Sequence, residues 1–193
     1  QSDFERRLTD LGGPRNGLMG EVLSRCAQAM PSEKYGLLER DIAHAHRAIS
    51  TCMVHSADFF HMAQLFAEAV EDGSNGKYDL RARVVPDARA SAEWEDIETS
   101  WENLHNALSP VIDALGRMAQ GLVESEMFDT EGIEDLVMSL NAALRHQDEF
   151  CIRMGELVSQ PSSEQVYWIE LSRDRKRLAL HIAPLDVGIL VEK

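Results

Sequence analysis

Apolar residues recur every three or four positions along three long stretches of the chain, and this spacing predicts three long helices. The first stretch, residues 38–70, contains no Pro or Gly and alternates steps of four and three residues without a break. Such a pattern is typical of a seam along which a helix packs against neighbouring helices. The seam positions of this helix are Leu38, Ile42, Ala45, Ile49, Cys52, Ser56, Phe59, Ala63, Phe66 and Val70.

Two further seams follow, so that long helices are expected over residues 33–71, 91–127 and 131–159. Breaker residues at 72–76 and 128–132 separate them, which favours antiparallel, up-down-up packing. Pro110 interrupts the second seam and removes a backbone hydrogen bond, so we expect a kink over residues 106–109. The second seam comprises Trp94, Ile97, Trp101, Leu104, Leu108, Val111, Leu115, Met118 and Leu122, and the third comprises Ile133, Leu136, Leu140, Ala143, Gln147, Phe150, Met154 and Leu157.

Three shorter segments alternate on a period of two and predict strands over residues 77–85, 165–172 and 177–183. A polar turn joins the last two into a β-hairpin, and the first is its natural third strand because a lone hairpin is marginal in water. We therefore expect one domain, residues 1–193, that is mainly α: an antiparallel bundle of three long helices with a short N-terminal helix, on a small antiparallel sheet of two or three strands.

The N-terminal helix is expected over residues 17–30, before the long helices begin. Its apolar face would comprise Leu18, Val22, Leu23 and Ala27. The polar stretch that ends in the breaker Gly12-Gly13-Pro14 leaves room for another short helix before it.

Composition restricts the function classes. An apolar fraction of 44% among 193 residues suffices for a core, and no apolar run of membrane-spanning length is present, so we expect no membrane partner. A net charge of −14 opposes binding of the whole chain to nucleic acid, which normally gains from Lys and Arg. The three cysteines, Cys26, Cys52 and Cys151, have no CxxC spacing, which favours a reducing cytoplasmic compartment over a disulfide framework or a zinc site.

Histidines gather at His44, His46, His55 and His61, but their spacing does not favour a metal site. His44 and His55 would lie about 16 Å apart along a helix axis, and Cys52 with His55 supplies two ligands where a site needs more. Polar positions flanking a core, or a contact surface, explain the histidines better. The carboxylates of residues 93–102 are typical of a solvated helix face. We therefore assign no catalytic, cofactor-binding or metal-ligating residue.

Aromatic and basic residues of the C-terminal hairpin are the remaining candidates for a binding surface. Tyr167 and Trp168 alternate, so one of the two must face away from the buried side of its strand. The basic turn is typical of a solvated hairpin tip that discourages edge aggregation, and such a turn can also contact phosphate. The candidate nucleic-acid contacts are Arg173, Arg175, Lys176 and Arg177.

The hairpin resembles a segment of the bacterial DinG-type helicases, which are relatives of XPD. The likeness is carried by VYWIE at residues 166–170 and by LALHIAPLDV at residues 178–187. A YDLR-like strand at 78–81 and a Trp-led helix near Trp94 are also similar. In that family such segments lead from an inserted helical domain, the arch, back into the second motor domain.

This resemblance implies that the chain is an arch-like domain, a piece of a longer ATP-dependent DNA helicase that acts in DNA repair or replication. The arch helps frame the path of the single strand, so the implied partners are the parent's motor domains and single-stranded DNA. ATP, magnesium and any iron–sulfur cluster would be held elsewhere in the parent, because this chain lacks a Walker A motif, a DEAH box and the cluster's cysteine spacing. We expect no ATP hydrolysis by the isolated piece, which could dimerise. The alternative is a free-standing acidic helical scaffold for protein partners.

Overall fold

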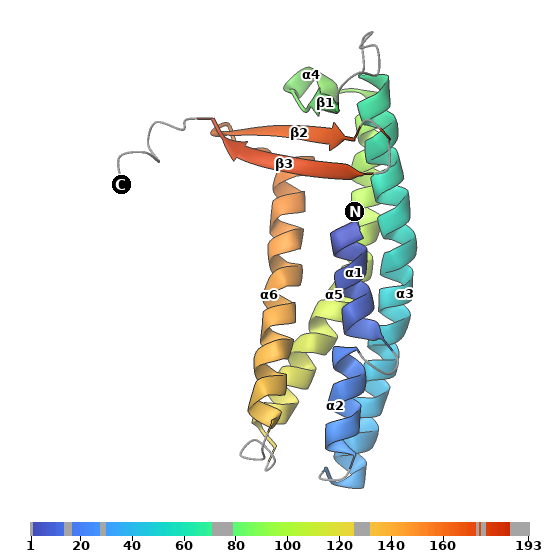
Figure 1. The fold of residues 1–193 in the computed structure, drawn as a ribbon, viewed down its shortest axis with the longest axis vertical. Helices are drawn as coiled ribbons and strands as arrows, with labels where there is room; N and C mark the ends of the chain where they lie inside the picture. Colours follow the sequence, from blue (N-terminus) through green and yellow to red (C-terminus); the bar gives the residue numbers. More distant parts are fainter. Residues whose placement is uncertain are drawn as a thin grey trace, which may run out of the picture. The chain divides into compact units, whose positions relative to one another are not determined.

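A computed structural model describes residues 2–13, 17–27, 30–70, 79–125, 132–172, 174 and 177–185 of the chain (Figure 1). Within these residues the chain is mainly helical and carries a three-stranded antiparallel sheet, so the expected fold class is confirmed. The elements are α1 (Ser2–Gly12), α2 (Leu18–Cys26), α3 (Ser32–Ala69), β1 (Leu80–Arg83), α4 (Pro86–Arg89), α5 (Ala92–Val123), α6 (Ile133–Val158), β2 (Gln165–Leu171) and β3 (Leu178–Pro184).

The three long helices and the hairpin strands begin and end within a few residues of the expected positions, whereas β1 is shorter than expected. In the N-terminal region α2 is the expected short helix, and α1 occupies the stretch before the glycines for which a further short helix was allowed. Helix α2 buries Met19, Val22 and Cys26, so the expected apolar face is correct for Val22 and wrong for the rest: Leu18 and Leu23 are half-buried and Ala27 is exposed. The spacing of three and four from Met19 to Cys26 defines the face that packs.

Burial follows the predicted seams closely. Every seam position of α5 is buried, and so is every seam position of α3 except Val70, which is 44% exposed and follows the last helical residue. On α6, Ala143 and Phe150 are half-buried and the other seam residues are buried. Helix α5 continues through Pro110, and the expected kink stays a prediction. The expected breakers at 72–76 and 128–131 lie outside the described residues.

The chain divides into two compact units, and each long helix contributes to both. We call residues 55–103 and 151–193, with Gln1, the sheet unit, and residues 2–54 and 104–150 the helical unit. The sheet unit contains all three strands and α4, and the helical unit contains α1 and α2.

In the sheet unit, aromatic pairs show the direction of the helices. Phe59 lies edge-on to Trp101 at 6.0 Å between ring centroids, and Phe66 lies edge-on to Trp94 at 5.0 Å. Residue numbers therefore rise along α3 where they fall along α5, so these two helices are antiparallel. Trp94, near the start of α5, donates its indole N–H to the carbonyl of Val158, the last residue of α6, at 3.2 Å. The up-down-up order is thus confirmed within this unit.

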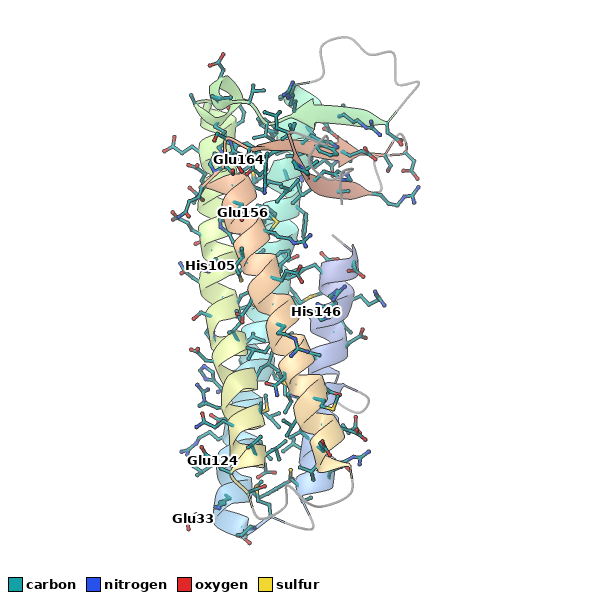
Figure 2. All side chains as sticks on the ribbon, turned by 90° about the vertical axis from the view of Figure 1, so that its left-hand side faces the viewer. Glu33, His105, Glu124, His146, Glu156 and Glu164 are labelled. Carbon is teal, nitrogen blue, oxygen red and sulfur yellow. The ribbon has the colours of Figure 1, made fainter. Side chains whose placement is uncertain are left out.

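The helical unit is held by contacts of its own. The rings of Phe4 on α1 and Phe150 on α6 stack with 4.2 Å between centroids. Arg117, late in α5, lies 3.6 Å from Asp41, early in α3, as expected for antiparallel helices. Acidic side chains such as Glu33 and Glu124 are exposed at the ends of these helices (Figure 2).

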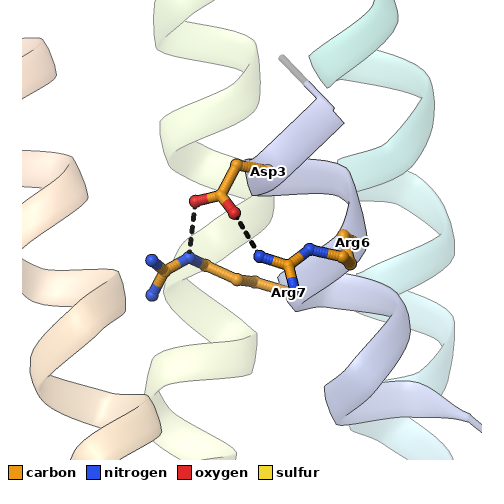
Figure 3. Close-up of polar contacts among 3 residues, drawn as sticks. All are labelled: Asp3, Arg6 and Arg7. Carbon is orange, nitrogen blue, oxygen red and sulfur yellow. Dashed lines mark hydrogen bonds and ion pairs between the residues drawn. The ribbon is translucent and has the colours of Figure 1, made fainter.

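A small ion cluster lies on the first turns of α1. Asp3 accepts hydrogen bonds from Arg6 and from Arg7, the latter at 3.0 Å (Figure 3). The Arg6 bond, followed by the Arg7 bond, holds the pKa of Asp3 below its ordinary value. An acidic residue in the first turn also suits the positive end of the helix dipole.

Candidate nucleic-acid interface

The sheet has two chemically different faces because its strands alternate. Strand β2 pairs antiparallel with β1 on one side and with β3 on the other. Residues opposite one another in register point to the same face. The inner face comprises the buried residues Ala82, Tyr167, Ile169, Leu171 and Leu178. We define the outer face by Arg81, Arg83, Val166, Trp168, Glu170, Ala179, His181 and Ala183, none of which is buried.

The inner face is fixed to the helices through Tyr167. Its hydroxyl accepts a hydrogen bond from the backbone N–H of Ser162 at 2.8 Å. The guanidinium carbon of Arg89 lies 5.3 Å from the centroid of the Tyr167 ring and 5.0 Å from that of Trp94. Burial lowers the pKa of the Arg89 guanidinium. The inner side of strand β2 is therefore anchored to α4 and α5. The outer-face residues lie on the opposite side of the strand.

An aromatic row crosses the outer face. Arg83 pairs with Trp168, and Trp168 pairs with His181, so the three residues lie on adjacent strands at one level. The indole and imidazole rings stack at 4.7 Å between centroids with only 3° between their planes. Both residues are half-buried. Trp168 Nε1 and His181 Nε2 are buried atoms without a hydrogen-bond partner in the described part of the chain.

The next row, toward the hairpin turn, carries an ion pair. Arg81 Nε donates to Glu170 Oε2 at 2.7 Å, and the Arg81 side chain is 69% exposed. An exposed pair of this kind adds about 0–1 kcal/mol to stability. The salt bridges formed by described residues do not include Arg83, which is exposed. The outer face therefore pairs one of its two arginines with Glu170 and presents the other to solvent.

The predicted basic turn is placed only in part. Arg173, Arg175 and Lys176 lie outside the described residues, whereas Arg177 is exposed. The backbone N–H of Ser172 donates to the carbonyl of Arg177 at 2.8 Å, and the N–H of Arg177 donates to Ser172 Oγ at 2.9 Å. Ser172 Oγ in turn donates to Asp174 Oδ1 at 2.6 Å. These bonds hold Arg177 at the turn of the hairpin, one residue before β3 begins.

Sequence reasoning missed Arg81 and Arg83 as site residues. The signal was present, because both fall between the apolar positions Leu80, Ala82 and Val84 of an alternating strand. Trp168, rather than Tyr167, is the aromatic residue that faces away from the buried side. The structure thus brings an outward tryptophan and two arginines to one face.

The helical histidines contribute no comparable arrangement. His44 and His61 are exposed, and His46 and His55 are half-buried. Among the described residues, no group of three or more His, Cys, Asp and Glu side chains is placed to hold a metal ion. A search of the same residues finds no helix that combines the length and the apolar character needed to cross a membrane.

A polar cavity of about 270 Å³ lies in the sheet unit between α6 and the hairpin. Its lining includes Arg153 and Glu156 from α6 and Gln165 from β2. Glu156 and Glu164 mark the end of α6 and the approach to β2 in Figure 2. The amide oxygen of Gln165 is buried without a described partner. A water molecule bound there would satisfy it.

Comparison of the chain with protein-family models, with curated proteins and with solved structures gives no match.

Proposed function

We propose that this chain is an arch-like, noncatalytic helical domain of a DinG-type, ATP-dependent DNA helicase that works in DNA repair or replication in the cytoplasm. In this role the domain shapes the path of the single strand beside the parent's motor domains. The motor supplies ATP hydrolysis with its magnesium, and any iron–sulfur cluster belongs to another segment of the parent.

The observation that carries this proposal is the meeting of the resembling segments in one sheet. Residues 166–170 lie in β2, residues 178–184 lie in β3, and the described part of the YDLR-like segment leads into β1. The β1 segment is far from the other two in the sequence, yet β1 pairs with β2 and β2 with β3. The segments that carry the resemblance are therefore neighbours in one sheet, and the long helices α5 and α6 lie between β1 and β2 in the chain.

Charge supports a geometric role for the helices. The chain carries a net charge of −14, and exposed acidic residues line the first turns of α5 and α6. Acidic helices repel phosphate and can bound a strand path without gripping it. Basic residues of the sheet and its turn would contact the strand. Arg81, Arg83 and Arg177 are exposed, and Arg81 is paired with Glu170.

The complete reading frame provides the first test. Motor motifs on either side of residues 1–193 are the expected result, and a frame without a Walker A motif would overturn the proposal. In the full-length protein, replacement of residues 1–193 by a short flexible linker should leave DNA-stimulated ATP hydrolysis within about threefold while reducing unwinding of a forked duplex at least tenfold. The isolated chain should hydrolyse no ATP above background, and turnover by it would contradict a noncatalytic domain.

The acidic scaffold remains the second candidate, and exposed apolar side chains on the helices favour it. Val54 and Leu65 of α3 are 61% and 46% exposed, and Met138 of α6 is 63% exposed. Single exposed apolar residues are common on protein surfaces, so this observation is weaker than the shared sheet. A complete reading frame without a motor would favour the scaffold.

A further inference from the structure

We propose that the outer face of the sheet is a stacking platform for one base of a single-stranded nucleic acid, with the base stacked on His181, Trp168 behind His181 in the same stack, and Arg83 at a phosphate further along the strand. The inference deepens the proposed function, on which it rests, because it names the surface at which the domain would touch the strand.

The geometry of the row suits this ligand. Trp168 and His181 present two rings that are parallel within 3° on adjacent strands, at the same level as Arg83. Every base has an aromatic face, so a protein ring can stack on it without reading the sequence. His181 lies on β3, which borders the sheet, so its ring has no further strand beside it among the described residues. A third ring can therefore extend the stack from that edge.

Local charge favours a polyanion over a basic or apolar protein partner. The charged outer-face residues are Arg81, Arg83 and Glu170, and the first of these already pairs with Glu170. One positive charge is left over on this face, whereas the whole chain carries −14. Arg177 lies at the turn end of the hairpin, one residue before β3 begins. Few phosphates can be neutralised here, so binding should be weak and moderately sensitive to salt.

A purely structural role is the competing explanation, because stacked cross-strand pairs also stabilise sheets. The two roles differ in what a ligand changes. A pair that only supports the sheet should give no signal on addition of an oligonucleotide. A platform should give a fluorescence change that requires both the indole and the base.

Tryptophan fluorescence of the 193-residue chain provides the test. Trp94 and Trp101 are 0% and 5% exposed, so quenching by a ligand at the surface reports Trp168. Titration with a dT 12-mer at low salt should quench the emission in a saturable way. A 12-mer of the same length with abasic sites should bind about 5- to 100-fold more weakly, which is the range expected for loss of one stacked base.

Variants separate the contributions. Trp168→Ala should weaken binding by a similar factor, followed by anisotropy of a labelled dT 12-mer, and Trp168→Phe should retain most of the affinity. Arg83→Gln should reduce the slope of log K against log salt by about 0.7, the value for one phosphate of a single strand. Arg40→Gln, an exposed arginine on α3, is the charge-matched control and should leave the slope unchanged.

The outcomes are decisive in both directions. Equal affinity for the abasic and intact oligonucleotides, or unchanged binding by folded Trp168→Ala, would overturn the platform. Absence of binding to the dT 12-mer at millimolar concentration would do the same. A motor-containing reading frame with no quenching leaves the proposed function standing without the platform. Quenching in a protein whose frame lacks a motor leaves the platform standing without the helicase.

Discussion

The side chains of Arg89 and Trp94 converge on a single carbonyl oxygen, that of Val158 at the end of α6. Arg89 Nη1 donates to this oxygen at 2.7 Å and Trp94 Nε1 donates to it at 3.2 Å. The last carbonyls of a helix have no partner within the helix, so the two donors satisfy an acceptor that would otherwise be orphaned. The Arg89 guanidinium also lies over the Trp94 and Tyr167 rings. One cation thus joins α4, α5, α6 and β2.

Replacing Arg89 should therefore destabilise the sheet unit. We expect Arg89→Ala to lower the free energy of unfolding by about 2–3 kcal/mol, because it removes a charged hydrogen bond and two cation–π contacts. Arg89→Lys should recover less than half of this loss, since an ammonium group cannot match the planar guanidinium. Urea unfolding followed by circular dichroism measures both. Arg81→Ala, which removes an exposed ion pair, is the control and should cost less than about 1 kcal/mol.

A buried hydroxyl on α3 offers a stabilising substitution. Ser56 is 0% exposed, and its Oγ has no hydrogen-bond partner among the described residues. Ser56→Ala should raise the free energy of unfolding by about 1–2 kcal/mol, because it removes an unsatisfied polar group and favours the helix.

The matched control for this substitution lies six residues earlier on the same helix. Ser50 is exposed and donates its hydroxyl to the carbonyl of His46 at 3.0 Å. Ser50→Ala should change stability by less than about 0.5 kcal/mol. Equal effects of the two substitutions would mean that Ser56 has a partner in solution.

The pH dependence of α1 should follow Asp3. Hydrogen bonds from Arg6 and then Arg7 hold the pKa of Asp3 below its ordinary value. A carboxyl group whose folded pKa is lowered stabilises the folded state above its unfolded pKa, near 3.9, and this contribution disappears as the pH falls through the folded pKa. Carboxyl chemical shifts should show Asp3 titrating below the ordinary range of an aspartate side chain. In Asp3→Asn the backbone amides of the second turn of α1, which bond back to the first turn, should lose protection from hydrogen exchange at neutral pH.

The long helices could be predicted from sequence because their burial depends on period alone. A seam such as that of α5 gives the helix a single apolar face, which must be buried whichever element covers it. Every predicted position on this face is buried. Short α2 was harder, because Leu18, Val22 and Leu23 fit a helical face about as well as Met19, Val22 and Cys26. Over so few residues, the neighbouring elements decide which face packs.

The outer face was less predictable, for a different reason. Alternation already showed that one of Tyr167 and Trp168 must point outward. The row of Arg83, Trp168 and His181, however, requires the register of three strands, and β1 is separated from β2 by α4, α5 and α6. Alternation within one strand carries no information on such register. The basic turn can be recognised from the sequence because its charges are consecutive. The two arginines of β1 become candidates only when β2 is seen to place Glu170 and Trp168 beside them.

The thiols should differ in reactivity according to burial. Cys26 and Cys52 are buried, and Cys151 is half-buried. Burial raises the pKa of the Cys26 thiol, which lowers the fraction of reactive thiolate in the folded state. At pH 8 we expect iodoacetamide to modify Cys26 at least tenfold more slowly than Cys151, as measured by mass spectrometry of peptides. In 8 M urea the rates should become similar, since all three thiols are then exposed. Rapid modification of Cys26 in the native protein would mean that α2 opens on the time scale of the reaction. The modification rate of Cys52 on α3 would then show whether the opening extends beyond α2 to the long helix.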